Sequence, residues 1–217
     1  MGIADGLVHI MDFAKAKKYD WVLTVDQDSV LDINLIDQYK KALKIYKNDD
    51  LGMLTCLIKD RNFTDTSIEK QSKSLIEVPI CITAGALTNV NNYFLTPGYD
   101  RKMFIDLVDT DICLSLREKG YKILRINYLG LYQEIGHGEN KRVFTKDIIV
   151  HHSSVFREYY MVRNAFVLSK RHPMTYNKIA LIKALLLNLF IISFYENNKM
   201  RRFVQYVRGV RDGINYR

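Results

Sequence analysis

The sequence predicts an α/β protein with a doubly wound, mostly parallel sheet flanked by helices, followed by a C-terminal helical extension. Two observations lead to this fold class. Helix-like and strand-like patterns alternate from residue 5 to residue 151, which is typical of sheets built from βαβ units. Short apolar runs bounded by polar residues, such as 21–25, have the pattern of strands buried on both faces. With 217 residues, 48% of them hydrophobic, the chain can form one such domain and a small appendage.

Apolar periodicity defines the first four elements. A helix is predicted at 5–18, where four apolar side chains share one face: Leu7, Ile10, Met11 and Ala14. Residues 21–25 form the first predicted strand. A second helix is expected from Asp32, which can cap it, and residues 51–58 form the second strand. The polar stretch 59–77 is compatible with a hairpin or with a loop.

The remaining elements continue the alternation. A strand is predicted at 79–83 and a short helix at 89–95. The helix expected over 108–119 ends at Gly120, because glycine suits the left-handed position that follows a helix. The elements predicted beyond it are strands at 121–128 and 147–151 and helices at 154–171, 176–196 and 197–213.

Positive charge is concentrated at the C-terminal end. The formal net charge is +8, and residues 157–217 contain twelve basic and three acidic side chains, whereas residues 1–156 are close to neutral. We therefore expect an α/β domain over 1–153 and a basic, apolar helical region over 154–217. Nucleic acid, an anionic membrane surface and a phosphorylated substrate are the partners that suit such a region.

The apolar run 179–194 contains a single charged residue. It is shorter than the ~20 residues that a membrane-spanning helix needs, so a buried or an interfacial helix is expected. Basic residues on both sides suit docking on an anionic leaflet. The N-terminus lacks a signal-peptide pattern, and Cys56, Cys81 and Cys113 have the context of free thiols in a reducing compartment. These features predict a cytoplasmic protein that is peripheral at the inner face of the plasma membrane.

Two aspartates follow the first predicted strand directly. Asp26 and Asp28 would lie at its carboxyl end, where ligands bind in open α/β sheets. Two carboxylates on one turn can share a divalent cation such as Mg²⁺ with phosphate oxygens and water. Alternatively, one of them simply caps the turn before the next helix.

A second acidic group lies at the start of the helix predicted over 108–119. Asp106, Asp109 and Asp111 fall within six residues. The helix dipole stabilises acidic side chains at such a position, which is the simpler explanation. Three carboxylates beside apolar neighbours exceed what capping needs, so one of them is a candidate general base.

A third polar group spans His151 to Phe166, in the stretch HHSSVFREYYMVRNAF. Its imidazole, hydroxyl and guanidinium groups, including those of Arg157 and Arg163, suit a phosphate-bearing partner. The same stretch is compatible with a basic amphipathic helix that serves as an interaction surface.

In this order, the three groups resemble the glycosyltransferase family 2 enzymes, and in particular the rhamnosyltransferase-like subgroup of bacterial polysaccharide assembly. The similar stretches are DQDS after the first strand, TAGALTNVNNYFLTPGYDRKMFIDLVDTDICLSLREKGYKI, and HHSSVFREYYMVRNAF. The resemblance covers most of residues 3–170. It implies a GT-A fold and transfer, with inversion, of a sugar from a nucleotide-sugar donor to a glycan or a lipid-linked oligosaccharide.

The resemblance also implies roles on the donor side. Asp28 would ligate Mg²⁺ or Mn²⁺, and Asp26 would contact the nucleotide sugar directly or through the metal. His152 matches a phosphate-side or third-ligand position, and the adjacent His151 is an alternative for it.

On the acceptor side, the resemblance makes Asp109 the catalytic base. In many relatives that residue follows a Glu, a place that Val108 takes here. Asp111 would support the site by hydrogen bonding, and Gly85 would let the backbone approach the acceptor.

Family members normally begin with a strand that ends in a T-Y-N-like turn, then a helix and a second strand. This chain begins with a segment that resembles the N-x-G-I-A helix found after those elements. The expectation is therefore a piece of a longer enzyme, or a truncated, inactive product that acts as a membrane-docked partner in a glycan assembly complex. No nucleic-acid partner is expected, since no recognisable module accompanies the basic residues.

Overall fold

The computed structural model describes residues 2–61, 74–133, 139–143, 146–150 and 153–216. The chain divides into two compact units. The sheet unit comprises Asp5–Asp100 and Asp109–Ile135, and the helical unit comprises Met1–Ala4, Arg101–Val108 and Gly136–Arg217. The functional division expected at residue 153 stays a prediction, because compactness alone does not define where a catalytic region ends.

The sheet unit is built on one mixed sheet with the strand order β1-β5-β3-β6-β2, and β4 also pairs with β6. The strands are β1 (Trp21–Leu23), β2 (Val30–Leu31), β3 (Leu51–Asp60), β4 (Leu75–Glu77), β5 (Leu87–Asn89) and β6 (Lys122–Gln133). Among these described strands, β3 and β6 pair in parallel and the other four pairings are antiparallel. The α/β class is confirmed, and the expectation of a mostly parallel sheet is corrected to a mixed one.

The parallel pair is the long one, and the crossover helix α4 (Val108–Glu118) leads into its second strand. The antiparallel partners are short. The strand predicted at 79–83 is wrong, because residues 78–86 form an irregular segment between β4 and β5. Pro79 has no N–H to donate, and the carbonyls of Thr83 and Ala86 accept hydrogen bonds from Thr24, so this backbone is satisfied outside a strand ladder.

Helices cover both faces of the β3–β6 pair. On one face, α2 (Leu35–Ile45) buries Leu35 and Tyr39 in a cluster with Leu54, Leu124 and other sheet residues. The face that bears Met53 is the opposite one, since side chains alternate along a strand. There the Met53 sulfur contacts Cys81, which in turn contacts Cys113 of α4.

The remaining helices of the sheet unit follow the sequence closely. Helix α1 (Ile3–Ala16) buries Leu7, Met11 and Ala14, three of the four side chains predicted to share a face. Helix α3 (Val90–Phe94) is capped by Asn89, whose side chain accepts from the Asn92 N–H. Helix α4 ends before Gly120, which has a φ of +84° as expected.

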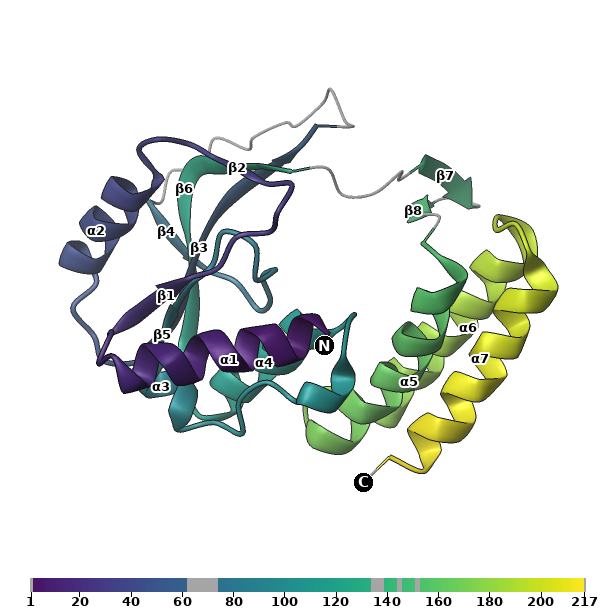
Figure 1. Ribbon diagram of the computed structural model, residues 1–217. Helices are drawn as coiled ribbons and strands as arrows, with labels where there is room; N and C mark the ends of the chain where they lie inside the picture. The colour runs from purple at the N-terminus through teal and green to yellow at the C-terminus, as the bar shows by residue number, and fades with distance from the viewer. Residues whose placement is uncertain (1, 62–73, 134–138, 144–145, 151–152, 217) are drawn as a thin grey trace. The chain divides into compact units, whose positions relative to one another are not determined.

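The helical unit contains the three C-terminal helices, as predicted: α5 (Val155–Arg171), α6 (Lys178–Phe194) and α7 (Lys199–Ile214) (Figure 1). A hairpin of β7 (Glu139–Val143) and β8 (Lys146–Val150) precedes them, and η1 (Arg101–Met103) is a short 3₁₀ turn. Helices α5 and α7 approach closely at Gly209 and Gly213 of α7. A Cβ added at either glycine would stand within 3 Å of α5 atoms. No described helix is long and apolar enough to span a bilayer.

A charged group is buried between α5 and α7. Arg202 lies 3.4 Å from Glu158 Oε2 and 2.8 Å from Glu196 Oε2, and each of the three side chains is at most 6% exposed. Burial raises the pKa of Glu158, and the hydrogen bond from Asn188 and the charge of Arg202 only partly oppose this. One guanidinium therefore does not fully compensate two carboxylates that lie out of water.

The raised pKa of Glu158 sets a pH dependence of stability. A raised folded-state pKa contributes stability below the unfolded-state value of 4.5, and that contribution is lost as pH rises through the folded-state pKa. Glu158→Gln keeps an oxygen for Arg202 but cannot ionise. Its free energy of unfolding, measured in urea, should therefore improve relative to the unmodified chain as pH rises from 4.5 towards neutrality. The exposed substitution Glu77→Gln is the control, and a difference independent of pH would contradict the assignment.

Candidate functional site

The end of strand β1 is tied to the irregular segment 81–86. The Thr24 N–H donates to the Ala86 carbonyl at 3.1 Å, and the Gly85 N–H donates to the Thr24 carbonyl at 2.8 Å. The Thr24 hydroxyl also donates to the Thr83 carbonyl at 2.5 Å. Asp26 begins the next turn, in which its carbonyl accepts from the Ser29 N–H at 3.1 Å. The predicted carboxylates thus follow a firmly held strand end.

The two carboxylates are exposed, and within the described part of the chain neither accepts a hydrogen bond. The simpler alternative, that Asp26 or Asp28 serves as a side-chain cap of the turn, therefore finds no support in the structure. Partial desolvation raises the pKa of Asp26, and the neighbouring negative charge of Asp28 raises it further. This loop holds two hard oxygen donors whose mutual repulsion a cation would relieve.

Gly85 fixes the path of the segment. Its φ is +73°, a left-handed conformation that glycine adopts without strain. Its carbonyl accepts a short hydrogen bond from the hydroxyl of Tyr39, which α2 presents from the protein core. An added Cβ would stand 3.3 Å from the Leu131 side chain. The structure thus shows why this position favours glycine, and its role towards an acceptor stays a prediction.

Two members of the second acidic group, Asp109 and Asp111, lie in the first turn of α4, and Asp106 precedes the helix. Asp111 is fully buried, whereas Asp109 is partly exposed. Asp109 shares a helical face with Cys113, four residues later, and the Cys113 sulfur accepts from the Cys81 N–H at 3.5 Å. The pKa of Cys81 is raised by the hydrogen bond with Cys113, by burial and by the charge of Asp109. Asp109 therefore lies near the start of the segment 81–86.

Within the sheet unit, the segment 81–86 links the loop of Asp26 and Asp28 to the helix that bears Asp109 and Asp111. Its beginning, at Cys81, contacts α4 one turn after Asp109, and its end, at Gly85 and Ala86, holds the strand that leads to Asp26. Burial, and after it the charge of Asp109, raises the pKa of the buried Tyr99. In the parts of the chain that the structure describes, no cluster of three or more His, Cys, Asp or Glu side chains is placed to hold a metal.

The third predicted group belongs to the helical unit. The guanidinium of Arg157 forms an ion pair with Asp106, with Nε 3.1 Å from Oδ1, and this partner raises the pKa of Arg157. Arg163 is buried and donates to the carbonyls of Lys102 and Met103 at 2.6 and 3.0 Å. Both arginines thus have partners within the protein, and their predicted role towards phosphate stays a prediction. His152, like its alternative His151, lies outside the described residues.

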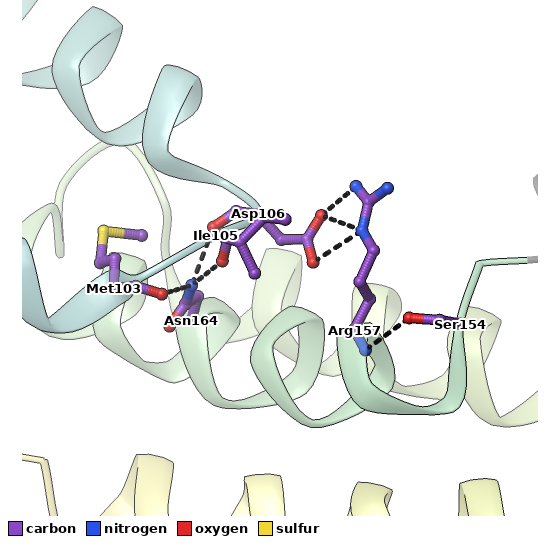
Figure 2. A network of polar contacts seen from close by, with 6 residues as sticks. All are labelled: Met103, Ile105, Asp106, Ser154, Arg157 and Asn164. Carbon is purple, nitrogen blue, oxygen red and sulfur yellow. Dashed lines mark hydrogen bonds and ion pairs between the residues drawn. The ribbon is translucent and has the colours of Figure 1, made fainter. Parts of the chain in front are cut away.

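Sequence reasoning gave no role to Asn164, which the structure places at the centre of a polar network (Figure 2). Its side-chain amide donates to the carbonyls of Met103, Ile105 and Asp106 at 2.8–3.0 Å, and the residue is fully buried. The sequence did carry a signal for this network, because Asn164 is a polar residue beside the apolar face of a predicted amphipathic helix. A buried amide at such a position needs hydrogen-bond partners.

The comparisons with known proteins show a distant similarity. No protein-family model matches the chain. The chain is 25% identical over 218 residues to the dTDP-rhamnosyl transferase RfbF of Shigella flexneri, a match that covers 93% of this chain and 71% of the relative. The similarity, over most of the chain, is thus to a glycosyltransferase.

Gly85→Ala should lower the free energy of unfolding by about 1–2 kcal/mol, because alanine is strained in the left-handed conformation. Gly120 is the matched control: its φ is +84°, and nothing lies within 4 Å of an added Cβ. Gly120→Ala should therefore show the backbone strain alone, and Gly85→Ala should lose at least as much because Leu131 must also move. Urea denaturation measures both, and an unchanged Gly85→Ala chain would contradict this account of the segment.

Proposed function

We propose that the protein is an inverting, metal-dependent glycosyltransferase of family 2 with a GT-A fold. It would move a sugar, with rhamnose as the candidate, from a nucleotide-sugar to a glycan or lipid-linked acceptor in bacterial surface polysaccharide synthesis. The observation that carries the proposal is the segment 81–86, which contacts both the strand end before Asp26 and the helix that bears Asp109. The distant similarity to a dTDP-rhamnosyl transferase supports the same reaction class.

The donor side rests on Asp26 and Asp28. Both carboxylates are exposed and accept no hydrogen bond from the described residues, so their oxygens are available to Mg²⁺ or Mn²⁺. A cation held by two carboxylates takes its other ligands from diphosphate oxygens and water, which fits this donor set. When bound, the cation offsets the negative charge that develops on the departing nucleoside diphosphate.

The acceptor side rests on Asp109. An acceptor hydroxyl must lose its proton as its oxygen attacks the anomeric carbon, and a carboxylate within hydrogen-bond reach can take that proton. Asp109 is partly exposed, whereas Asp111 is fully buried and the Asp106 carboxylate is held by Arg157. Of the three acidic residues, Asp109 therefore suits the role of base, and Asp111 suits a supporting one.

Two variants test the assignment. Asp28→Asn should remove most calorimetric binding of Mn²⁺ in the presence of dTDP, because one of two ligands is lost. Asp109→Asn should retain that binding but lower sugar transfer ~10²–10⁴-fold, the usual contribution of a general base. Asp37→Asn, an exposed change on α2 paired with Lys40 at 3.6 Å, is the control for both measurements.

Undiminished Mn²⁺ binding by Asp28→Asn would refute the metal assignment. Near-normal transfer by Asp109→Asn, with transfer lost in Asp106→Asn or Asp111→Asn, would move the base to one of those residues. A chain that binds Mn²⁺ with dTDP but releases no dTDP from dTDP-rhamnose would be a non-catalytic partner in glycan assembly.

The helical unit supports a second part of the proposal, docking on the anionic inner face of the plasma membrane. Helix α6 is apolar on nearly every side, yet five large apolar side chains are at least half exposed: Ile179, Ile182, Leu186, Leu187 and Phe194. Helix α7 adds exposed Met200, Phe203, Val204 and Val207. Exposed basic residues border them on the same helices: Lys178, Lys183, Lys199, Arg201, Arg208 and Arg211. Exposed apolar side chains that are bordered by basic residues suit binding to an anionic bilayer.

Binding to vesicles tests the docking. The chain should sediment with phosphatidylglycerol vesicles and not with phosphatidylcholine vesicles, and high salt should weaken binding, since each basic residue near the surface contributes about 1 kcal/mol. The double change Ile182→Asn and Leu186→Asn should release the chain. Ile33→Asn, at a 92% exposed position of the sheet unit, is the control. Equal, salt-insensitive binding to both vesicles would show that charge plays no part.

A further inference from the structure

The backbone just before α4 has an unusual conformation. Phe104, Asp106 and Leu107 have φ values of +65°, +66° and +61°, in the left-handed region that residues other than glycine rarely adopt. Such a conformation is strained for a residue that carries a Cβ. A turn of this kind persists only where surrounding contacts hold it.

Helix α5 supplies those contacts within the helical unit (Figure 2). The Asn164 amide nitrogen donates to the carbonyls of Met103, Ile105 and Asp106 at 3.0, 2.8 and 2.8 Å. Its carbonyl oxygen accepts from Arg163 Nε and Nη2 at 3.0 and 2.8 Å, which fixes the orientation of the amide. One fully buried side chain thus donates hydrogen bonds to three carbonyls of the strained turn.

Two further contacts reinforce the turn from the same helix. Arg157 forms its ion pair with the Asp106 carboxylate, and the Phe104 ring stacks on Tyr160 with the ring centroids 4.9 Å apart. The Asp106 side chain is only 8% exposed, so its charge is paired where water is scarce. These two contacts hold side chains. The backbone carbonyls of Met103 and Phe104 also accept from Arg163 and from the Ala4 N–H, and Asn164 is the residue that binds the carbonyls of Ile105 and Asp106.

We propose that Asn164 is a positioning residue for sugar transfer. The chain passes from Leu107 directly into α4, whose second residue is Asp109. The conformation of the turn therefore sets the residue at which α4 begins and keeps Asp109 within a formed first turn. Asn164 touches no substrate in this scheme and acts only through the backbone. The part that concerns transfer rests on the proposed role of Asp109.

The test is Asn164→Ala, with Asn92→Ala as the matched control. Asn92 is also buried, and its amide also donates to two carbonyls, those of Asp49 and Leu51, at 3.0 and 2.9 Å. Both variants should lose similar stability. Only Asn164→Ala should lower kcat, about 10- to 100-fold, because a displaced catalytic group loses its alignment. KM for the donor and the affinity for Mn²⁺ with dTDP should stay unchanged.

Hydrogen exchange provides a readout that does not depend on activity. In Asn164→Ala the amides of residues 104–111 should exchange faster, whereas in Asn92→Ala they should not. Adding Leu107→Gly to Asn164→Ala should restore part of the lost kcat, because glycine adopts the left-handed conformation without support. A role confined to stability predicts no such recovery.

Two results would overturn the proposal: unchanged exchange at 104–111 in Asn164→Ala, or an equal loss of kcat in Asn92→Ala. If the unmodified chain transfers no sugar, the proposed function fails, and the exchange measurement still decides whether Asn164 sets the start of α4.

Discussion

The hydrogen bonds between Thr24 and the segment 83–86 are the interaction on which the sheet unit's candidate site depends. Strand β1 has only three residues, so its ladder with β5 cannot by itself fix the loop that follows. Beyond the ladder, the N–H, the carbonyl and the hydroxyl of Thr24 all form hydrogen bonds with the segment 83–86. Gly85 allows these hydrogen bonds because it adopts a left-handed φ, and its carbonyl accepts a hydrogen bond from the hydroxyl of Tyr39 on α2. The exposed carboxylates of Asp26 and Asp28 thus follow a strand end that is also fixed by hydrogen bonds outside its ladder.

Both units hold irregular backbone with buried polar side chains rather than with regular ladders. In the sheet unit, Asn92 donates to carbonyls at the start of β3, and in the helical unit Asn164 does the same for the turn before α4. Since an unpaired buried carbonyl is costly, each amide both satisfies the backbone and selects one conformation of it. The buried Arg202, shared between two glutamates, shows the opposite case, in which pairing is incomplete and the cost appears as a raised pKa of Glu158.

Local patterns predicted the helices and the longer strands, but neither the short strands β2, β5 and β7 nor the pairing between strands. The helices α1 to α5 and the long strand β3 follow apolar periodicity, which is a property of neighbouring residues. Asp32 does not cap α2 as expected, because the helix begins at Leu35 after Asn34, which makes no side-chain cap hydrogen bond. The antiparallel partners of β1 and β6 were not predictable, because an apolar run carries no information about the direction of its neighbour. The apolar residues at 79–83 resemble a strand, but their backbone is held by Thr24 and Cys113, which lie far away in the sequence. Arg157 and Arg163 were predicted from charge alone, and no sequence pattern revealed Asp106 or the carbonyls of Lys102 and Met103 as their partners.

What distinguishes the five aspartates of the two acidic motifs is not their spacing but what each carboxylate contacts. Asp106 is paired with Arg157, and Asp111 is withdrawn completely from solvent. Asp26 and Asp28 are exposed and accept no hydrogen bond from any described residue, while Asp109 remains partly exposed, near Cys81 and Tyr99. A carboxylate already neutralised by the protein has little left to offer a cation or a proton, whereas one left exposed keeps both capacities. By this criterion Asp26 and Asp28 are carboxylates that the described part of the protein leaves open to a cation, whereas the role of Asp109 as a base rests on its partial exposure and stays a proposal.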